Sequence, residues 1–328
     1  MLLYIARRVL LIVPTMLVVS IVAFIIIQLP PGDFLTVLAS RLASTGETLD
    51  QASLEALKIR YGLGEPVYVQ YWKWITGIIL RGDFGQSFLW NQPVKVLIWE
   101  RMGLTMTISI VTLIFTWMVA FPIGIYSAVR KYSIGDFIAT FFGFMGLATP
   151  NFMIALVLMW ISFKYFGVTV GGLFSDQYIN AAWSMGKIWD LMQHLWIPMV
   201  ILGTGGTAGL IRVMRNNLLD ELHRPYVVTA RSKGMSENAL IMKYPVRMAL
   251  NPFVSTVGWS LPGLVSGETI VATVLSLPTA GPLLLQALMS QDMFLAGAFI
   301  LMLSFLTIIG TLISDILLAF LDPRIRFE

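Results

Sequence analysis

Residues 9–29 read VLLIVPTMLVVSIVAFIIIQL, a run in which no side chain is charged. A helix needs about 20 such residues to cross a hydrocarbon core about 30 Å thick. Arg7 and Arg8 precede the run, and Pro30 follows it without the small-residue cleavage site of a secretory signal peptide. We therefore expect a membrane-spanning helix that is retained in the protein.

The composition of the whole chain agrees with this expectation. Of the 328 residues, 57% are hydrophobic and 12% are charged, whereas a soluble domain has roughly 25% charged residues. The net charge is +4, but the basic residues gather at the ends of apolar runs, so nucleic-acid binding is not expected. The absence of cysteine excludes disulfide bonds and thiolate metal sites.

Six apolar runs are long enough to cross a bilayer, which predicts an all-α, polytopic membrane protein. They cover about residues 9–29, 103–128, 136–163, 196–219, 250–272 and 294–320.

Four prolines fall inside or at the ends of these runs. They are Pro122, Pro150, Pro198 and Pro262. We expect the membrane helices to accommodate them, because neighbouring helices can satisfy the backbone groups that a proline frees. Glycines such as Gly143 and Gly146 are expected to permit close helix contact.

The short loops indicate the orientation of the chain. With both termini in the cytoplasm, 13 of the 22 Lys and Arg residues lie on the cytoplasmic side. Most of the others lie in residues 30–102, a loop longer than the roughly 60 residues beyond which loop charge stops governing topology. We therefore expect both termini in the cytoplasm.

The domain organisation follows from these spans. We expect an N-terminal helix over residues 1–29, a folded extracytoplasmic cap over 30–102, a five-helix core over 103–320 and a cytoplasmic tail over 321–328. Helical spacing of apolar residues up to Tyr61, and an aromatic segment after Pro66, predict two helices in the cap. The loop at about 164–195 is expected to cover the mouth of a pore.

The loop at residues 220–249 is the most informative part of the core, because polar and basic residues gather there between two apolar runs. Pro225 can open a helix at its first turn, Gly234 can adopt the left-handed conformation that ends it, and Ser236 can cap the next helix. The pattern predicts a short helix, a turn and a second helix. Residue chemistry alone leaves two roles open, contact with anionic headgroups and docking of a partner.

Residues 226–235 read YVVTARSKGM, and residues 244–252 read YPVRMALNP. These two segments resemble the EAA loop of ABC importer permeases of the dipeptide and oligopeptide type. The resemblance implies that the loop forms the coupling helix that docks on an ATPase subunit. The docking residues that it implies are Tyr226, Thr229, Ala230, Arg231, Lys233, Gly234 and Met235.

Short motifs similar to those of the same family occur in the same order along nearly the whole chain. They include PGD at residues 31–33, GDFGQS at 82–87, TPNF at 149–152 and LDPRIR at 321–326. The resemblance implies a multi-pass subunit of the bacterial inner membrane. It also implies pairing with a second, related permease, with two ATPase subunits and with an extracytoplasmic solute-binding protein.

Peptides are the solute that the resemblance implies. Residues 244–245 are Tyr-Pro where the family often has His-Ala, and residues 278–281 read PTAG where it often has Pro-Gly-x-Gly. Oligosaccharides, opines and metal chelates therefore stay open as alternative solutes.

The sequence offers no site for ATP or for catalysis. Gly186-Lys187 is followed by Ile188 and lacks the upstream glycine of a P-loop, so ATP and Mg²⁺ are expected to be used by partner subunits. His194 and His223 are isolated, which predicts neither a metal site nor a catalytic residue. A secondary transporter is the alternative from another class, but no convincing internal repeat is present.

Glu268 is the ionisable residue that stands out within a predicted span. Such a residue is costly in a membrane and is by default a candidate functional group. We expect it to face the translocation path or a partner subunit, with structural pairing to another span as the alternative. Asp315, near the end of the sixth span, is expected to serve a structural role.

Overall fold

A computed structural model describes most of the chain. The described residues are 2–28, 59, 64–87, 89–167, 170–251, 253–254, 269–290 and 292–321. Their regular elements are helices, apart from one isolated bridge between Gln86 and Pro93. The all-helical class is thereby confirmed for this part of the chain.

The chain forms two compact units. Unit 1 comprises Met1–Gly103 and Leu283–Leu306, and unit 2 comprises Leu104–Pro282 and Thr307–Glu328.

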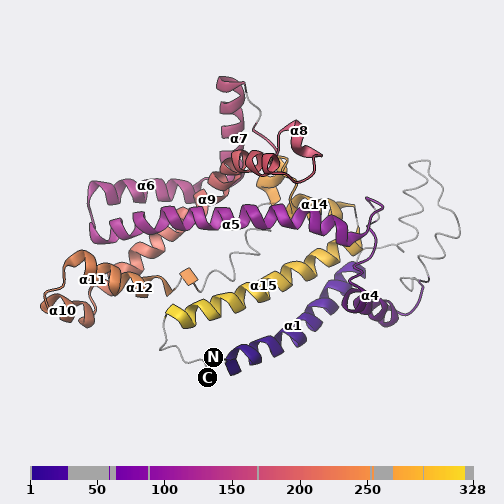
Figure 1. Cartoon of the computed structure of the whole chain (residues 1–328), viewed down its shortest axis with the longest axis horizontal. Coiled ribbons are helices and arrows are strands. Elements are labelled where there is room, and N and C mark those ends of the chain that lie inside the picture. Colours follow the sequence, from indigo (N-terminus) through magenta and orange to yellow (C-terminus); the bar gives the residue numbers. More distant parts are fainter. Residues whose placement is uncertain are drawn as a thin grey trace. The chain divides into compact units, whose positions relative to one another are not determined.

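Among the described residues, four helices are long and apolar enough to cross a membrane on their own. They are α1 (Leu2–Gln28), α5 (Val94–Val129), α9 (Met185–Leu222) and α15 (Met293–Leu321). Figure 1 shows all four under these labels. The first, second, fourth and sixth predicted spans are thus confirmed as helices of sufficient length. Pro122 and Pro198 lie inside α5 and α9, as expected.

Helix α9 begins earlier than predicted. Its N-cap is Ser184, whose hydroxyl accepts a hydrogen bond from the backbone N–H of Lys187 at 3.2 Å. The prediction that Lys187, Asp190 and His194 belong to a loop is therefore wrong, because all three lie in the first turns of α9.

The third predicted span is not one straight helix. Helix α6 (Ile134–Ala148) is followed by α7 (Asn151–Ile161) and the π-helix η1 (Ser162–Phe166), with a bend of 98° between the two parts. Thr149 has an extended backbone, as expected for a residue that precedes a proline. Pro150 therefore marks a break in the third predicted span, whose two parts together are long and apolar enough for one bent crossing.

The fifth predicted span falls largely outside the described residues. Pro262 and Glu268 belong to this segment, and helical structure resumes at residues 269–274. A count of six spans, and the cytoplasmic location of both termini, therefore stay predictions.

In unit 1, α1 packs on α4 (Val67–Arg81), the helix predicted from the aromatic segment after Pro66. The Phe24 ring lies 5.5 Å from each of the rings of Tyr71 and Trp74, between centroids. The hydroxyls of Ser20 and Tyr71 are hydrogen-bonded at 2.7 Å. The other predicted cap helix, which ends at Tyr61, lies largely outside the described residues.

A buried carboxylate fixes the loop after α4 to the beginning of α15. Asp292 has no exposed surface, and its carboxylate accepts hydrogen bonds from the Ser87 hydroxyl at 2.5 Å and from the Leu89 N–H at 3.2 Å. The same side chain caps α15 by accepting from the Leu295 N–H at 3.4 Å. The GDFGQS sequence is thus held against a helix about 200 residues away in the chain.

In unit 2, glycines of α6 and α9 permit close helix approach. A Cβ atom added to Gly146 of α6 would lie 3.1 Å from Cγ2 of Thr204 in α9. A Cβ atom added to Gly203 of α9 would lie 2.8 Å from the Phe115 ring of α5. The expected close contact is confirmed at Gly146, whereas an added Cβ at Gly143 would meet no atom within 4 Å.

The remaining described helices of unit 2 are short. The helix α8 (Asp176–Ile179) precedes α9, and the Asp190 carboxylate ties the start of α8 to α9 by accepting from the N–H and hydroxyl of Ser175 at 2.8 and 2.6 Å. The helix α14 (Ala280–Met289) begins where the Ala280 N–H donates to the Thr105 hydroxyl of α5 at 2.8 Å.

Candidate functional site

Three short helices follow the end of α9. They are α10 (Pro225–Ser232), α11 (Glu237–Lys243) and α12 (Pro245–Ala249). Pro225 stands at the first turn of α10, where its missing N–H costs no hydrogen bond. Gly234 has a φ of +80°, the left-handed conformation that ends a helix most readily at glycine. The predicted helix, turn and helix are thus observed.

One face of α10 is buried in a cluster of side chains that α9 and α11 also supply. Val227 has no exposed surface and Ala230 is nine-tenths buried. Both belong to a cluster of buried apolar side chains, which also includes Met214 and Leu218 of α9 and Leu240 of α11. Because packed interiors resist deformation, this cluster holds α10, α11 and the end of α9 together as one rigid part.

The opposite face of α10 is exposed. Five of the seven predicted docking residues are exposed: Tyr226, Thr229, Arg231, Lys233 and Gly234. Ala230 lies in the buried cluster, and the half-buried Met235 packs against it. The predicted set therefore divides into an outer surface and two residues that support it from within.

An ion pair braces the turn between α10 and α11. The Arg231 guanidinium donates two hydrogen bonds to the Glu237 carboxylate, from Nε to Oε1 and from Nη2 to Oε2, the latter at 3.1 Å. These bonds lower the pKa of Glu237 and raise that of Arg231. The pair joins the two helices across Gly234, and a bidentate geometry of this kind fixes their relative orientation.

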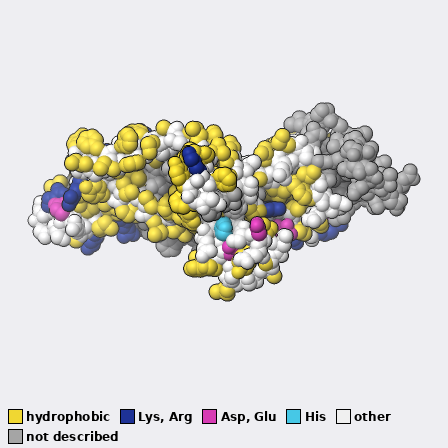
Figure 2. All heavy atoms as spheres, turned by 90° about the horizontal axis from the view of Figure 1, so that it is seen from above, with side chains coloured by type: hydrophobic (Ala, Val, Ile, Leu, Met, Phe, Trp, Pro, Cys, Tyr) yellow, Lys and Arg dark blue, Asp and Glu magenta, His cyan; other side chains and the backbone are white. Residues whose placement is uncertain are grey.

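A second polar contact ties α10 to α9. The Tyr226 hydroxyl donates to Oε2 of Glu221, in the last turn of α9. Partial burial and this hydrogen bond raise the pKa of Tyr226. In Figure 2, basic and acidic side chains gather where α10 and α11 lie, whereas hydrophobic side chains cover much of the neighbouring surface. This surface suits contact with a polar protein partner.

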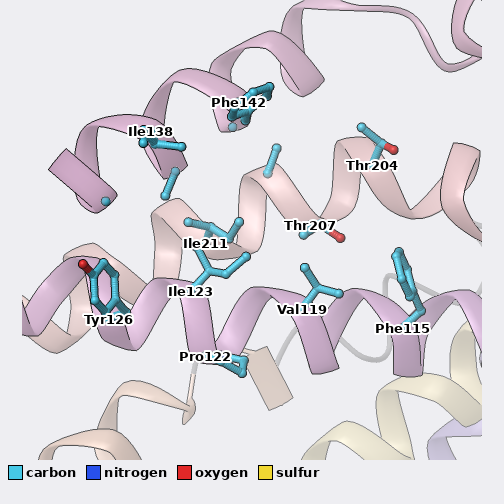
Figure 3. Close-up of a pocket in the computed structure, with 14 residues that line it drawn as sticks. Phe115, Val119, Pro122, Ile123, Tyr126, Ile138, Phe142, Thr204, Thr207 and Ile211 are labelled. Carbon is cyan, nitrogen blue, oxygen red and sulfur yellow. The ribbon is translucent and has the colours of Figure 1, made fainter.

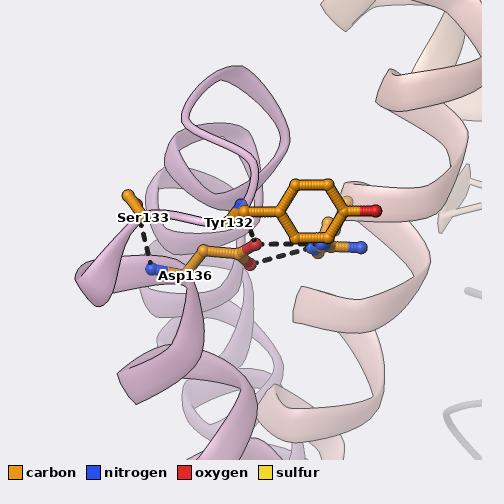
Figure 4. A network of polar contacts seen from close by, with 4 residues as sticks. Tyr132, Ser133 and Asp136 are labelled. Atoms are coloured by element: carbon orange, nitrogen blue, oxygen red, sulfur yellow. Dashed lines mark hydrogen bonds and ion pairs between the residues drawn. The ribbon is translucent and has the colours of Figure 1, made fainter.

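Sequence reasoning missed an ion pair between α6 and α9 (Figure 4). The Arg215 guanidinium donates from Nε and Nη2 to the two carboxylate oxygens of Asp136, at 2.8 and 2.9 Å. Asp136 is almost fully buried, and it also accepts from the Tyr132 N–H at 2.9 Å. The available signal was that both charges lie near the ends of predicted spans joined to loops on the same side of the membrane.

An apolar cleft of about 600 Å³ lies between α5, α6 and α9 (Figure 3). Ile123 of α5, Ile138 of α6 and Ile211 of α9 contribute to its lining. Thr207 of α9 also lines it, and its nearly buried hydroxyl has no hydrogen-bond partner among the described residues. Glu268 lies outside the described residues, so its predicted place in a translocation path stays a prediction.

No cluster of metal ligands is present in the described part of the chain. No group of three or more His, Asp or Glu side chains is placed to hold a metal ion there. His194 and His223 each contact a backbone carbonyl one helical turn earlier, at 2.8 and 2.7 Å.

Family comparisons cover almost the entire chain. Residues 120–327 match the family described as "Binding-protein-dependent transport system inner membrane component", and residues 1–111 match the family described as "Binding-prot-dependent transport system membrane comp, N-term".

Curated relatives match over their full lengths. The oligopeptide transport system permease protein AppB of Bacillus subtilis is 35% identical over 326 residues, which is 99% of each chain. The dipeptide transport system permease protein DppB of Alkalihalophilus pseudofirmus is 29% identical over 341 residues, with 100% of each chain covered. The glutathione transport system permease protein GsiC of Salmonella paratyphi A is 30% identical over 328 residues, also with 100% of each covered.

A solved structure of the MetNI methionine ABC transporter, in an inward-facing conformation, aligns with a TM-score of 0.49 and 16% sequence identity. The alignment covers 70% of this chain and 97% of that chain.

Proposed function

The chain belongs to the family of inner membrane components of binding-protein-dependent transport systems, and from that premise we propose that it is one permease subunit of an ABC importer for peptides. The permease assignment rests on the family and on relatives that match from end to end. Peptides are the proposed solute because the relatives are named for oligopeptide, dipeptide and glutathione transport.

The proposed coupling mechanism rests on one observation: one face of α10 is buried and the opposite face is exposed. Its exposed face offers Tyr226, Thr229 and Arg231 to a partner, while Val227 and Ala230 are buried in the cluster that includes the end of α9. A force on the exposed face therefore reaches α9 without passing through a flexible segment. In this mechanism the partner is an ATPase subunit whose closure on ATP displaces α10.

The displacement continues from α9 into α6. The bidentate Asp136–Arg215 pair and the close contact at Gly146 join these two helices. A shift of α9 therefore carries α6 with it and changes the cleft that α5, α6 and α9 enclose. The chain supplies a moving half of the translocation path, and the second half comes from a related permease.

The energy comes from outside the chain in this proposal. ATP and Mg²⁺ are used by two separate ATPase subunits, and a solute-binding protein on the extracytoplasmic side delivers the peptide. The permease itself is not an enzyme and binds no cofactor. The absence of a P-loop in the sequence supports this division of labour.

Uptake in proteoliposomes tests the proposal. The chain would be reconstituted with its partner permease, ATPase subunits and binding protein, and uptake of a labelled peptide measured with and without ATP. We expect uptake to require all of these components. Peptide uptake that persists without the ATPase subunits, and follows an ion gradient instead, would contradict the proposal and favour a secondary transporter.

A further inference from the structure

A second groove, of about 220 Å³, lies between α6 and α9, and its lining includes the Asp136–Arg215 pair. We call it the α6–α9 groove. One end is polar and is lined by Tyr132, Arg212 and Asn216 next to the Asp136–Arg215 pair. The rest is apolar and includes Phe137, Phe144 and Leu147 of α6. A polar end joined to an apolar slot matches an amphipathic ligand.

The spacing of charges along α9 sets the depth of the polar end. No Asp, Glu, Lys or Arg occurs between Asp190 and Arg212. These two residues are 22 positions apart, which corresponds to about 33 Å at about 1.5 Å per residue. The hydrocarbon core is about 30 Å thick, so Arg212 lies at the level of lipid headgroups when Asp190 lies at the opposite surface.

The polar end carries a positive charge that the groove does not neutralise. Arg215 is paired with Asp136, but Arg212, which lines the groove, forms no ion pair among the described residues. The same holds for Lys131, which does not line the groove but precedes the lining residue Tyr132. The Arg212 guanidinium carbon lies 5.8 Å from the centre of the Phe144 ring, and Lys131 Nζ lies 4.7 Å from the centre of the Tyr132 ring. Both side chains are exposed and remain free to bind an anion.

The apolar slot has open space at Gly143. This glycine lines the groove, and a Cβ atom added to it would meet no atom within 4 Å. Gly143 is therefore not needed for helix contact, unlike Gly146 one turn later. The open space at Gly143, with Phe137, Phe144 and Leu147 in the same lining, can hold part of an acyl chain.

We propose that the α6–α9 groove binds an anionic phospholipid, with the headgroup phosphate at Arg212 and Lys131 and one acyl chain in the slot beside Gly143. Basic pockets between membrane helices at headgroup level are known to suit such lipids. The ligand would hold α6 and α9 together from the membrane side, at the same level as the Asp136–Arg215 pair. This proposal concerns a site other than the coupling surface, and its test needs no transport.

Native mass spectrometry of the purified full chain, titrated with phosphatidylglycerol or phosphatidylcholine, tests the proposal. We expect phosphatidylglycerol to bind more tightly, and Arg212→Ala and Lys131→Ala each to weaken it about fivefold, which corresponds to about 1 kcal/mol for one cation near the membrane surface. Lys164→Ala is the matched control for Lys131→Ala, because Lys164 Nζ also lies over an aromatic ring, at 4.5 Å from the Trp160 ring centre. Trp160 does not line the groove, whereas Tyr132, the ring under Lys131, does.

The slot is tested separately by filling it. Gly143→Leu should weaken binding of phosphatidylglycerol severalfold, whereas Gly209→Leu should not, because Gly209 of α9 also has open space around it but does not line the groove. Helical content by circular dichroism controls for folding.

Three outcomes would overturn the proposal. Equal binding of the two lipids is the first, and unchanged binding in both Arg212→Ala and Gly143→Leu is the second. The third is a loss of association with the partner permease in Gly143→Leu, with lipid binding unchanged, since that result would make the groove a protein interface.

Discussion

At the scale of single residues, Arg231 has a role that its sequence context did not reveal. It was predicted as a docking residue, yet its guanidinium is already bound bidentately by Glu237. The pair lies on the surface and is worth little in overall stability. Its effect is instead on the angle between α10 and α11, which determines how the exposed face is presented.

This assignment makes a prediction for charge reversal. Arg231→Glu should lower the amount of peptide transported per ATP severalfold, because two carboxylates then face each other across the turn at Gly234. The double variant Arg231→Glu/Glu237→Arg restores an ion pair and should recover most of the coupling. Uptake and ATP hydrolysis, measured in the same proteoliposomes, give the number of peptides transported per ATP hydrolysed. A double variant as uncoupled as the single one would mean that Arg231 contacts the partner directly.

Gly234 provides the second residue-scale prediction. Its φ of +80° strains any β-branched side chain, although nothing lies within 4 Å of an added Cβ. Gly234→Val should therefore cost about 1 to 3 kcal/mol in local stability and uncouple hydrolysis from uptake while the chain still inserts into the membrane.

Gly234→Asn is the matched control, because asparagine tolerates the left-handed region better than valine does. Hydrogen exchange of the backbone amides in α10 measures the local effect. Equal exchange and normal transport in both variants would contradict the role assigned to this turn.

At the scale of elements, α6 and α9 depend on one ion pair. Breaking a buried pair by removing one partner costs about 3 to 5 kcal/mol, and we expect about 2 kcal/mol for Asp136→Ala because Arg215 is partly exposed. The double variant Asp136→Ala/Arg215→Met leaves no unpaired charge and should be more stable than the single variant. Thermal unfolding in detergent ranks the two. A single variant as stable as the unaltered protein would show that the pair contributes nothing to the α6–α9 contact.

The helices also show which of their ends can be predicted from the local sequence. The turns around α10 could be predicted because Pro225 and Gly234 act on their own backbone. The break between α6 and α7 could not, because Pro150 has the same local chemistry as Pro122 and Pro198, which lie within continuous helices. Whether a proline ends a helix or is absorbed by it depends on neighbours that are distant in sequence.

At the scale of the whole molecule, the fold was predicted from the length of the apolar runs in the sequence. Residues 9–29 could be assigned from the sequence because the thickness of the bilayer sets a simple requirement. The Asp136–Arg215 pair joins residues 79 positions apart, and the Ser87–Asp292 hydrogen bond joins residues 205 positions apart. Neither partner carries a local signal that identifies the other, so these contacts required the structure.

The close approach of α9 to α5 at Gly203 has a mechanical consequence. Gly203 is 18 residues from the beginning of α9 at Met185 and 19 from its end at Leu222, about 27 and 28 Å at the rise of an α-helix. Distances from spin labels at the two ends of α9 to labels on α5, compared with and without ATP, would register any rotation about this point; shifts in the same direction at both ends would exclude it. A rod that pivots at its midpoint is an equal-armed lever: each ångström by which α10 is pushed would be returned, undiminished and reversed, at the opposite membrane surface.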